Sequence, residues 1–448
     1  MTSDKLGELS LDSVKVTTLP VAKFPTLALA QENLRSQVLR QAAWNGEKRV
    51  EIVPEVNAAS KDAIALLVRV KAGDATRYAG IAYDIASNRA YGSPALIEPA
   101  RWADFVAAVA AAEGGDKVAP ALAEEAYPFG NAPALAFLPD GGLLVLGEAH
   151  VVVPADQVSP MLTPLGRKLQ AGATKPEKAE PAQAVKDPEP GLTGAVPAAG
   201  GATASPAEPS GTATPSPSGD SHSARPRISL GPDCEKLKCV ALTFDDGPVP
   251  ETRDLVKVLR DKRAPVSFFA LGNNVKAHPG VLKEIAAEGH QVGWHTVTHG
   301  ELPRLSADRV RREVGEGPTS LLQLVGWAPT VFRPPYGAHN AKVDEVIKAN
   351  NMVNVMWSVD TKDWDKTRVQ GEALTQAVIS SAVRDSKPGG IILVHDIHAT
   401  SRAAAGPIVD QLTKQGFTFV TVTELPGWQD FSWGKSYCAA PSLKASCF

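Results

Sequence analysis

Two histidines four residues apart are the clearest chemical signal in this sequence. His295 and His299 stand in the segment HTVTH. In a helical turn this spacing puts both imidazoles on one face. With one carboxylate they could bind a divalent metal, Zn2+ or another such as Co2+, and leave a position open for water or substrate. An isolated pair at this spacing is more often structural. Thr296 stands where a zinc protease carries its glutamate, so a catalytic base must come from another segment.

The adjacent carboxylates Asp245 and Asp246, in TFDDGP, supply what the histidines lack. Metal-assisted hydrolysis needs one carboxylate on the metal and one that takes a proton from water. We assign Asp246 to the metal and Asp245 to the base, because neighbouring residues at a strand end can point to different sides of a site. A bound cation would offset the repulsion between them.

The region that carries these residues alternates short apolar strands with helical stretches. The predicted strands are residues 239–246, 265–272, 290–296, 330–335, 353–360, 389–396 and 417–425. Repeated β-α units predict a parallel sheet, since parallel strands need crossover connections. About seven repeats favour a (β/α) barrel, complete or incomplete, over a doubly wound sheet.

Polar residues follow five of these strands, at the end where barrel loops build active sites. They are Asp245 with Asp246, His295 with His299, Arg333, Asp360 with Asp363, and His395 with Asp396. A single aspartate at a strand end is often only a helix cap. Five strands that end in this way instead indicate an active site.

Five motifs occur in a fixed order along this region. They are TFDDGP (243–248), HTVTH (295–299), RPPYG (333–337), DTKDW (360–364) and LVH (393–395). The set resembles the polysaccharide deacetylases, which have a NodB-homology domain and form carbohydrate esterase family 4. The resemblance implies a distorted (β/α) barrel and metal-dependent removal of the N-acetyl group from N-acetylglucosamine in a polymer, peptidoglycan above all. One departure is Gly300, where the family usually has proline.

The resemblance also implies roles for the other motif residues. Arg333 would pair with Asp245, and His395 would be the general acid, oriented by Asp363. The backbone N–H of Tyr336 would help to hold the oxyanion. Two further residues would wall the pocket for the acetyl methyl group, namely Trp364 and Leu393. The plainer alternatives are a surface ion pair for Arg333 and a core aromatic for Trp364.

Other functions remain open at this point. The same residues could act on chitin oligomers or on acetyl esters of xylan, because the loops that select a substrate are not readable from sequence. A third possibility is a non-catalytic protein that binds or senses cell wall. The net charge of −3 gives no support for nucleic-acid binding, and no apolar run is long enough to span a membrane.

A segment rich in proline, alanine and serine divides the chain. Residues 171–228 contain no aromatic side chain, which predicts a disordered linker. It would separate an α+β domain, residues 1–170, from the deacetylase domain, residues 229–448. The first domain has strands and a hairpin but no catalytic constellation, so we interpret it as a wall-associated or positioning module. Its residues 134–154 weakly resemble the extracellular domain of lysozyme-sensing anti-sigma factors.

The four cysteines form two close pairs in the sequence, Cys234 with Cys239 and Cys438 with Cys447. Their number and spacing predict two short-loop disulfides and an oxidising compartment. A zinc site made of all four is the alternative. The N-terminus has no secretory signal pattern. An extracellular or wall-associated location therefore rests on the cysteines and the family, with the export route open.

Overall fold

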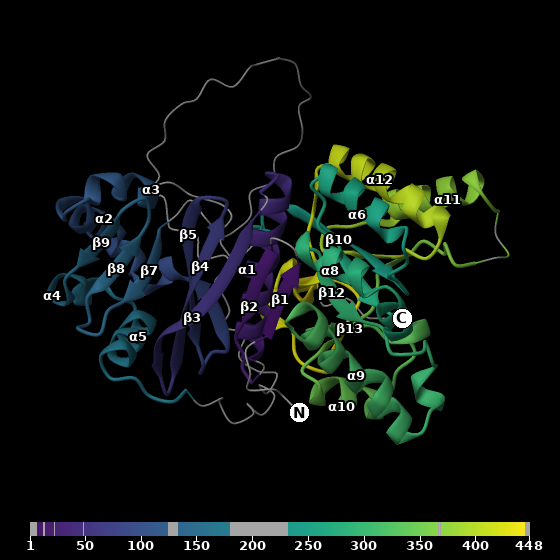
Figure 1. Cartoon of the computed structure of the whole chain (residues 1–448), viewed down its shortest axis with the longest axis horizontal. Helices are drawn as coiled ribbons and strands as arrows, with labels where there is room; N and C mark the ends of the chain where they lie inside the picture. Colours follow the sequence, from purple (N-terminus) through teal and green to yellow (C-terminus); the bar gives the residue numbers. More distant parts are fainter. Residues whose placement is uncertain are drawn as a thin grey trace, which may run out of the picture.

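The computed structural model describes residues 7–11, 14–21, 23–47, 49–123, 133–179, 232–365, 367 and 369–443. Within these residues the chain forms an N-terminal α+β region and a C-terminal (β/α) barrel that lie against each other (Figure 1). Most of the predicted linker lies outside the described residues, as does Cys447. No helix in the described part of the chain is both long enough and apolar enough to cross a membrane.

The barrel sheet is parallel throughout the described strands, as the β-α alternation predicts. The strands are hydrogen-bonded in the order β15-β16-β10-β11-β12-β13-β14-β18, and β17 also pairs with β10. Their bounds are β10 (Lys238–Asp245), β11 (Ser267–Ala270), β12 (Gln291–Trp294), β13 (Val331–Phe332), β14 (Val353–Val355), β15 (Val359–Asp360), β16 (Ile391–His395), β17 (Phe417–Phe419) and β18 (Ser436–Tyr437).

The sheet curls into an incomplete barrel, which confirms the predicted fold class. The single strand expected at residues 353–360 is in fact two short strands, β14 and β15, near opposite edges of the sheet. Because only residues 356–358 join them, Val355 and Val359 can be at most about 14 Å apart. A bridge between Gly390 and Ala439 also connects the two sides. The edges therefore lie close together, although no ladder between described strands closes them.

Helices cover the outside of the barrel (Figure 1). They are α6 (Thr252–Asp261), α7 (Gly272–Ala277), α8 (Pro279–Ala287), α9 (Ala307–Val325), α10 (Ala341–Ala349), α11 (Glu372–Asp385) and α12 (Ala399–Lys414). The sequence also predicts helices at residues 251–263, 281–289, 306–317, 341–350 and 371–385, and these correspond to α6 and α8 to α11. Helices α7 and α12 were not predicted. The disulfide predicted between Cys234 and Cys239 is present, with the Cα atoms 5.4 Å apart. The second pair stays a prediction.

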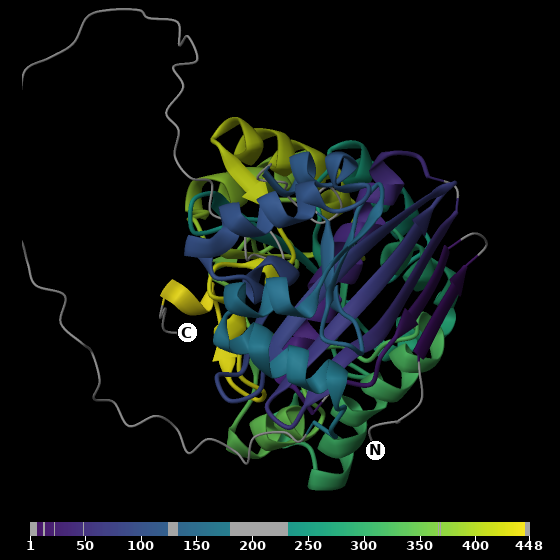
Figure 2. The ribbon, with the colours of Figure 1, turned by 90° about the vertical axis from the view of Figure 1, so that its left-hand side faces the viewer.

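The N-terminal region contains two sheets. Strands β1 (Gly7–Leu11), β2 (Val14–Thr18), β3 (Val50–Ser60), β4 (Ala63–Ala72), β5 (Ala75–Asp84) and β6 (Arg89–Gly92) pair in chain order, and β7 (Ala134–Phe137), β8 (Leu143–Leu146) and β9 (His150–Val153) form a smaller sheet. The helices are α1 (Pro25–Trp44), α2 (Trp102–Ala111), α3 (Ala119–Ala123), α4 (Ala155–Val158) and α5 (Pro164–Thr174). Figure 2 shows the small sheet and its helices on the outer face of the large sheet. Helix α5 continues past the predicted domain end at residue 170.

Helix α1 lies between the large sheet and the barrel (Figure 1). It contacts β3, β5 and β6 on one side, and α6, α8 and the 3-10 turn Val422–Glu424 on the other. Leu29 is fully buried in the same apolar cluster as Cys239 and Val353 of the barrel. Sequence reasoning did not predict this helix. The two regions therefore share a core, in addition to being joined along the chain.

Buried polar contacts also connect α1 to the barrel. Arg40 Nη2 lies 2.5 Å from Glu424 Oε1, and both side chains are buried. Gln291, the first residue of β12, donates from Nε2 to Glu32 Oε1 at 3.1 Å. These contacts lie at the N-terminal ends of the barrel strands. The N-terminal region thus covers the end of the barrel opposite the predicted catalytic residues.

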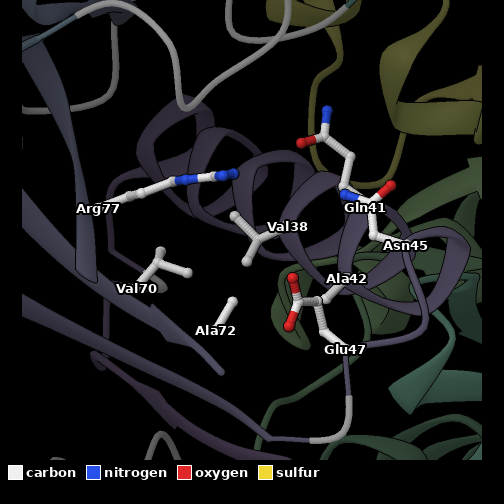
Figure 3. Close-up of a pocket in the computed structure, with 8 residues that line it drawn as sticks. All are labelled: Val38, Gln41, Ala42, Asn45, Glu47, Val70, Ala72 and Arg77. Carbon is white, nitrogen blue, oxygen red and sulfur yellow. The ribbon is translucent and has the colours of Figure 1, made fainter. Parts of the chain in front are cut away.

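A small hollow separates part of α1 from the large sheet (Figure 3). It is lined by Val38, Gln41, Ala42, Asn45, Glu47, Val70, Ala72 and Arg77. None of the predicted site residues lines it, so it is separate from the barrel chemistry.

Candidate active site

The C-terminal ends of neighbouring barrel strands bring the predicted acid and base together. Asp245 ends β10 and is in register with His395, which ends β16. His295 follows β12 directly, and Arg333 follows β13 directly. All four side chains are buried. The structure therefore confirms that these side chains cluster at the C-terminal edge of the sheet.

Asp246, His295 and His299 form a group that can hold a metal ion. Asp246 Oδ1 lies 3.5 Å from His295 Nε2 and 3.3 Å from His299 Nε2. One ligand atom from each residue falls within 4.8 Å of the others. Asp246 Oδ1 is buried and has no hydrogen-bond partner among the described residues. Since a buried carboxylate oxygen needs a partner, these residues fit a divalent cation.

The HTVTH segment is a loop, and the helical turn assumed from its spacing is wrong. Thr296 and His299 both have left-handed backbone angles, with φ of 70° and 63°. The two imidazoles still face the same point, with ring centroids 5.1 Å apart. The two left-handed residues thus bring both imidazoles to one side of the loop, as the period of a helix would do.

The other ring nitrogen of each histidine is also engaged. His295 Nδ1 lies 2.7 Å from the carbonyl oxygen of Arg333, and His299 Nδ1 lies 3.2 Å from the hydroxyl of Tyr336. Such contacts orient an imidazole and direct Nε2 toward a metal. Burial lowers the pKa of His295, although the charges of Asp245 and Asp246 oppose this. His295 is therefore neutral near pH 7, as a metal ligand must be.

Arg333 holds one oxygen of Asp245. Arg333 Nη1 donates to Asp245 Oδ1 at 2.7 Å and to Thr243 Oγ1 at 2.8 Å. The guanidinium also lies over the Phe269 ring, 4.1 Å from its centroid, and is fully buried. A surface ion pair is thereby excluded for Arg333. Asp245 Oδ2 lies on the side of His295, 3.9 Å from its Nε2.

His395 and Asp363 form a buried hydrogen-bonded pair. His395 Nδ1 lies 2.8 Å from Asp363 Oδ1, and the backbone N–H of His395 donates to Asp363 Oδ2 at 2.8 Å. The hydroxyl of Ser401 also donates to Asp363 Oδ2. Burial alone would lower the pKa of His395, but the hydrogen bond and charge of Asp363 outweigh it and raise the pKa to about 9. His395 is thus protonated at neutral pH, with Nδ1 occupied by Asp363.

The residues predicted to contact substrate lie around the same strand ends. Tyr336 has φ of 62° and is 68% exposed. Trp364 is 48% exposed and donates from Nε1 to Asp360 Oδ1 at 3.3 Å, so it is not a core aromatic. Leu393 is buried on β16, two residues before His395. Their roles toward the acetyl group stay predictions.

Asp396 supports the turn that carries the two aspartates. Its side chain is fully buried, and Oδ2 accepts a hydrogen bond from Thr252 Oγ1 at 2.5 Å. A Cβ atom on Gly247 would lie 2.1 Å from the same oxygen, so only glycine fits there. Burial and the nearby charge of Asp246 raise the pKa of Asp396 to about 7. The sequence placed Asp396 at a strand end but indicated no role for it.

The barrel presents paired carboxylates, imidazoles and an arginine at the C-terminal ends of its strands, the end at which (β/α)-barrel enzymes carry their active sites. The sequence model described as polysaccharide deacetylase matches residues 233–355. A peptidoglycan-N-acetylglucosamine deacetylase of Bacillus cereus is 34% identical over 200 residues, which cover 43% of this chain and 90% of that protein. The chain therefore belongs to the polysaccharide deacetylase family.

Two further comparisons show how far the likeness extends. The peptidoglycan-N-acetylglucosamine deacetylase PgdA of Listeria monocytogenes is 38% identical over 207 residues, which span 46% of this chain but only 42% of PgdA. The solved structure of a T48 deacetylase with substrate is 41% identical, with a TM-score of 0.43, and the match covers 46% of this chain and 98% of that one.

Proposed function

We propose that this chain hydrolyses the N-acetyl group of N-acetylglucosamine residues in a cell-wall polysaccharide, most directly peptidoglycan, and releases acetate. The observation that carries the proposal is the placement of Asp245 and His395 in register on adjacent strands, beside the Asp246, His295 and His299 group. The names of the Listeria and Bacillus relatives support the same substrate. Such a substrate would require the enzyme to act outside the cell or at the wall.

Asp246, His295 and His299 would hold the cation, which we propose to be Zn2+ or another divalent metal such as Co2+. Bound there, such a cation polarises a carbonyl group and makes water easier to deprotonate. The two imidazoles and one carboxylate leave room in the coordination shell, as sites that act on substrates do.

Asp245 would act as the general base. Because Arg333 occupies Oδ1 of Asp245, Oδ2 is the oxygen that faces the histidine group and can take a proton from water. The buried guanidinium also keeps this carboxylate in place. Arg333 is thus expected to fix the geometry of the base without touching the substrate.

His395 would act as the general acid. Its pKa of about 9 keeps it protonated at neutral pH, so it can give its proton to the leaving amine nitrogen. Asp363 binds Nδ1, which leaves Nε2 as the nitrogen that delivers the proton. The backbone N–H of Tyr336 would donate to the oxyanion, and Trp364 and Leu393 would enclose the acetyl methyl group.

An acetate-release panel tests the proposal. Purified full-length protein with added Zn2+ is incubated with peptidoglycan, chitin oligomers and acetylated xylan, and free acetate is measured by a coupled assay. We expect release from peptidoglycan, with deacetylated glucosamine identified by mass spectrometry of the digested product. Preference for chitin oligomers or xylan would reassign the substrate. Wall binding without acetate release from any of them would replace the enzyme proposal by a non-catalytic role.

A further inference from the structure

Glu313 is a buried carboxylate that the proposed chemistry does not use. It lies on α9 and its side chain is only 1% exposed. Its neighbours on the buried face of this helix are apolar or small, among them Val310, Val314 and Gly317. A glutamate on such a face is costly unless its oxygens are fully hydrogen-bonded.

Both oxygens of Glu313 are hydrogen-bonded, and most of the donors belong to the loop between the two histidines. Oε2 accepts from the backbone N–H groups of Val297 and Thr298, each at 2.9 Å. Oε1 accepts from Thr298 Oγ1 at 2.8 Å and from Arg309 Nε at 2.9 Å. Val297 and Thr298 lie between His295 and His299. Glu313 therefore binds the middle of the segment whose two ends carry the imidazoles.

The loop needs external support because its backbone is strained. Thr296 and His299 adopt left-handed angles, each of which costs on the order of 1 kcal/mol for a residue with a side chain. Helix α7 holds the loop from the other side, because Gly272 N and Asn273 N donate to the carbonyls of Thr296 and Val297 at 2.9 and 3.0 Å. Helix α7 thus binds carbonyl groups of the loop, and Glu313 binds its backbone N–H groups.

The carboxylate of Glu313 is ionised at neutral pH. Burial would raise its pKa, but the hydrogen bonds from Thr298, Val297 and Arg309 outweigh burial and hold the pKa below its usual value. Hydrogen bonds to an ionised acceptor are about twice as strong as neutral ones. The loop amides therefore donate to a charged acceptor.

We propose that Glu313 is a positioning residue that sets the spacing of His295 and His299 for the metal ion. The inference rests on the proposed metal site. Mutation of a residue that orients a metal ligand commonly weakens metal binding by roughly 10- to 100-fold. What matters here is the reach of the side chain to the two loop amides, because these bonds determine where the loop lies.

Two variants of Glu313 separate the effect of side-chain length on metal binding from the effect of its charge. Glu313→Gln keeps the length of the side chain and one carbonyl oxygen for both amides, but loses the charge. Glu313→Asp keeps the charge, but its carboxylate is one methylene too short to reach Val297 and Thr298. The matched control is Glu316→Asp, one turn further along α9, where the carboxylate pairs with Lys276 at 2.6 Å and does not bind the loop.

Zn2+ binding to full-length apoprotein is measured by isothermal titration calorimetry, with thermal unfolding of each apoprotein as a check on folding. We expect Glu313→Asp to weaken Zn2+ binding roughly tenfold or more, and Glu313→Gln and Glu316→Asp to stay within about threefold of the wild type. A folded Glu313→Asp variant with wild-type affinity would overturn the inference. A loss in Glu313→Gln as large as that in Glu313→Asp would also overturn it, since a side chain of full length would then not be enough to position the histidines.

The calorimetry also distinguishes this inference from the proposed function. A wild-type protein that binds no Zn2+ removes the metal site itself, whatever the variants do. If the wild type and a folded Glu313→Asp variant bind Zn2+ equally well, the proposed metal site stands. Only the role of Glu313 is then rejected.

Discussion

The two oxygens of Asp245 have different surroundings, and this difference decides what the residue can do. Oδ1 is bound to the buried Arg333 guanidinium at 2.7 Å, whereas Oδ2 lies on the side of the imidazoles. Asp246, its neighbour, presents an unpartnered oxygen to both histidines. The backbone geometry at the end of β10, where Asp246 has φ of 74°, thus directs the two adjacent carboxylates to different partners.

We predict different losses for the base and for a ligand. Asp245→Asn can still accept from Arg333 and leaves all three ligands in place, so it should retain metal but lose turnover by about 100-fold or more. His299→Ala should lose both, because it removes a ligand. Metal content by mass spectrometry, measured beside acetate release, checks this. Turnover at the wild-type level in Asp245→Asn would refute its assignment as the base.

The Asp363 carboxylate should control the alkaline limit of activity. Because it is the main group that raises the pKa of His395, Asp363→Asn lowers that pKa. The acid is active only when protonated, so kcat/KM should fall at a pH at least about one unit lower than in the wild type. A bound cation shifts both enzymes in the same direction, so the comparison isolates Asp363.

The control for this pH prediction is Ser401→Ala. It removes one hydrogen bond to Asp363 but leaves the negative charge beside His395. Its alkaline limb should therefore move much less than that of Asp363→Asn. Coincident pH profiles for the wild type and Asp363→Asn would show that His395 is not the acid.

Helix α9 and strand β12 must fit closely because both support the HTVTH loop. The close approach occurs at Gly317, where a Cβ atom would lie 2.4 Å from Trp294 Cγ. Trp294 is fully buried, ends β12, and donates from Nε1 to the Glu313 carbonyl at 2.9 Å. The same contact thus positions both the strand before His295 and the helix that carries Glu313.

Gly317→Ala should destabilise the protein by about 1–3 kcal/mol through overpacking against Trp294. Gly315→Ala, on the same helix, is the matched control, since its Cβ would meet only the side-chain amide of Asn350, at an ordinary 3.5 Å from Oδ1 and 3.8 Å from Nδ2. That change should be neutral or stabilising by up to about 1 kcal/mol, because alanine is the better helix former. Urea unfolding measures both. Equal midpoints for the two variants would contradict the proposed fit.

For the whole molecule, the main finding is that the two regions share buried contacts. Arg40 and Glu424 form a buried ion pair across them, and Leu29 enters the barrel core. The sequence predicted a tether between separate domains. That division stays a prediction, but the contacts around α1 show that the described parts of the two regions pack on each other, at the end of the barrel opposite Asp245 and His395.

A cleavable linker tests this arrangement. With a specific protease site inserted between residues 180 and 231, we expect the cut chain to elute as one species in size-exclusion chromatography, because the α1 contacts hold the pieces together. Elution as two separate fragments would show that the contacts are too weak and would favour the tether.

Two interface variants refine the cleavage test. Arg40→Ala should promote dissociation after the cut, because a buried charge left without its partner costs about 3–5 kcal/mol. Arg89→Ala removes the partly exposed pair with Asp430 and should change little, about 0–1 kcal/mol. Equal dissociation of the two variants after cleavage would show that the buried Arg40–Glu424 pair does not hold the two regions together.

Most strands of the barrel and the polar residues at their C-terminal ends could be predicted from the sequence, because both are local. An apolar strand that ends in a chemically capable side chain is visible in a few residues, and strand ends meet at one edge of any parallel sheet. Asp245, His295, Arg333 and His395 were placed correctly on these grounds.

The tertiary structure decided what depends on contacts between distant residues. Helix α1 is buried on nearly all sides, by the large sheet and by the barrel, so it has no polar face whose period would reveal it. The shape of the HTVTH loop depends on Glu313, which follows it on α9, and on α7, which precedes it. The residue types therefore determined which reaction the site can support, while packing between distant segments determined how those residues are held.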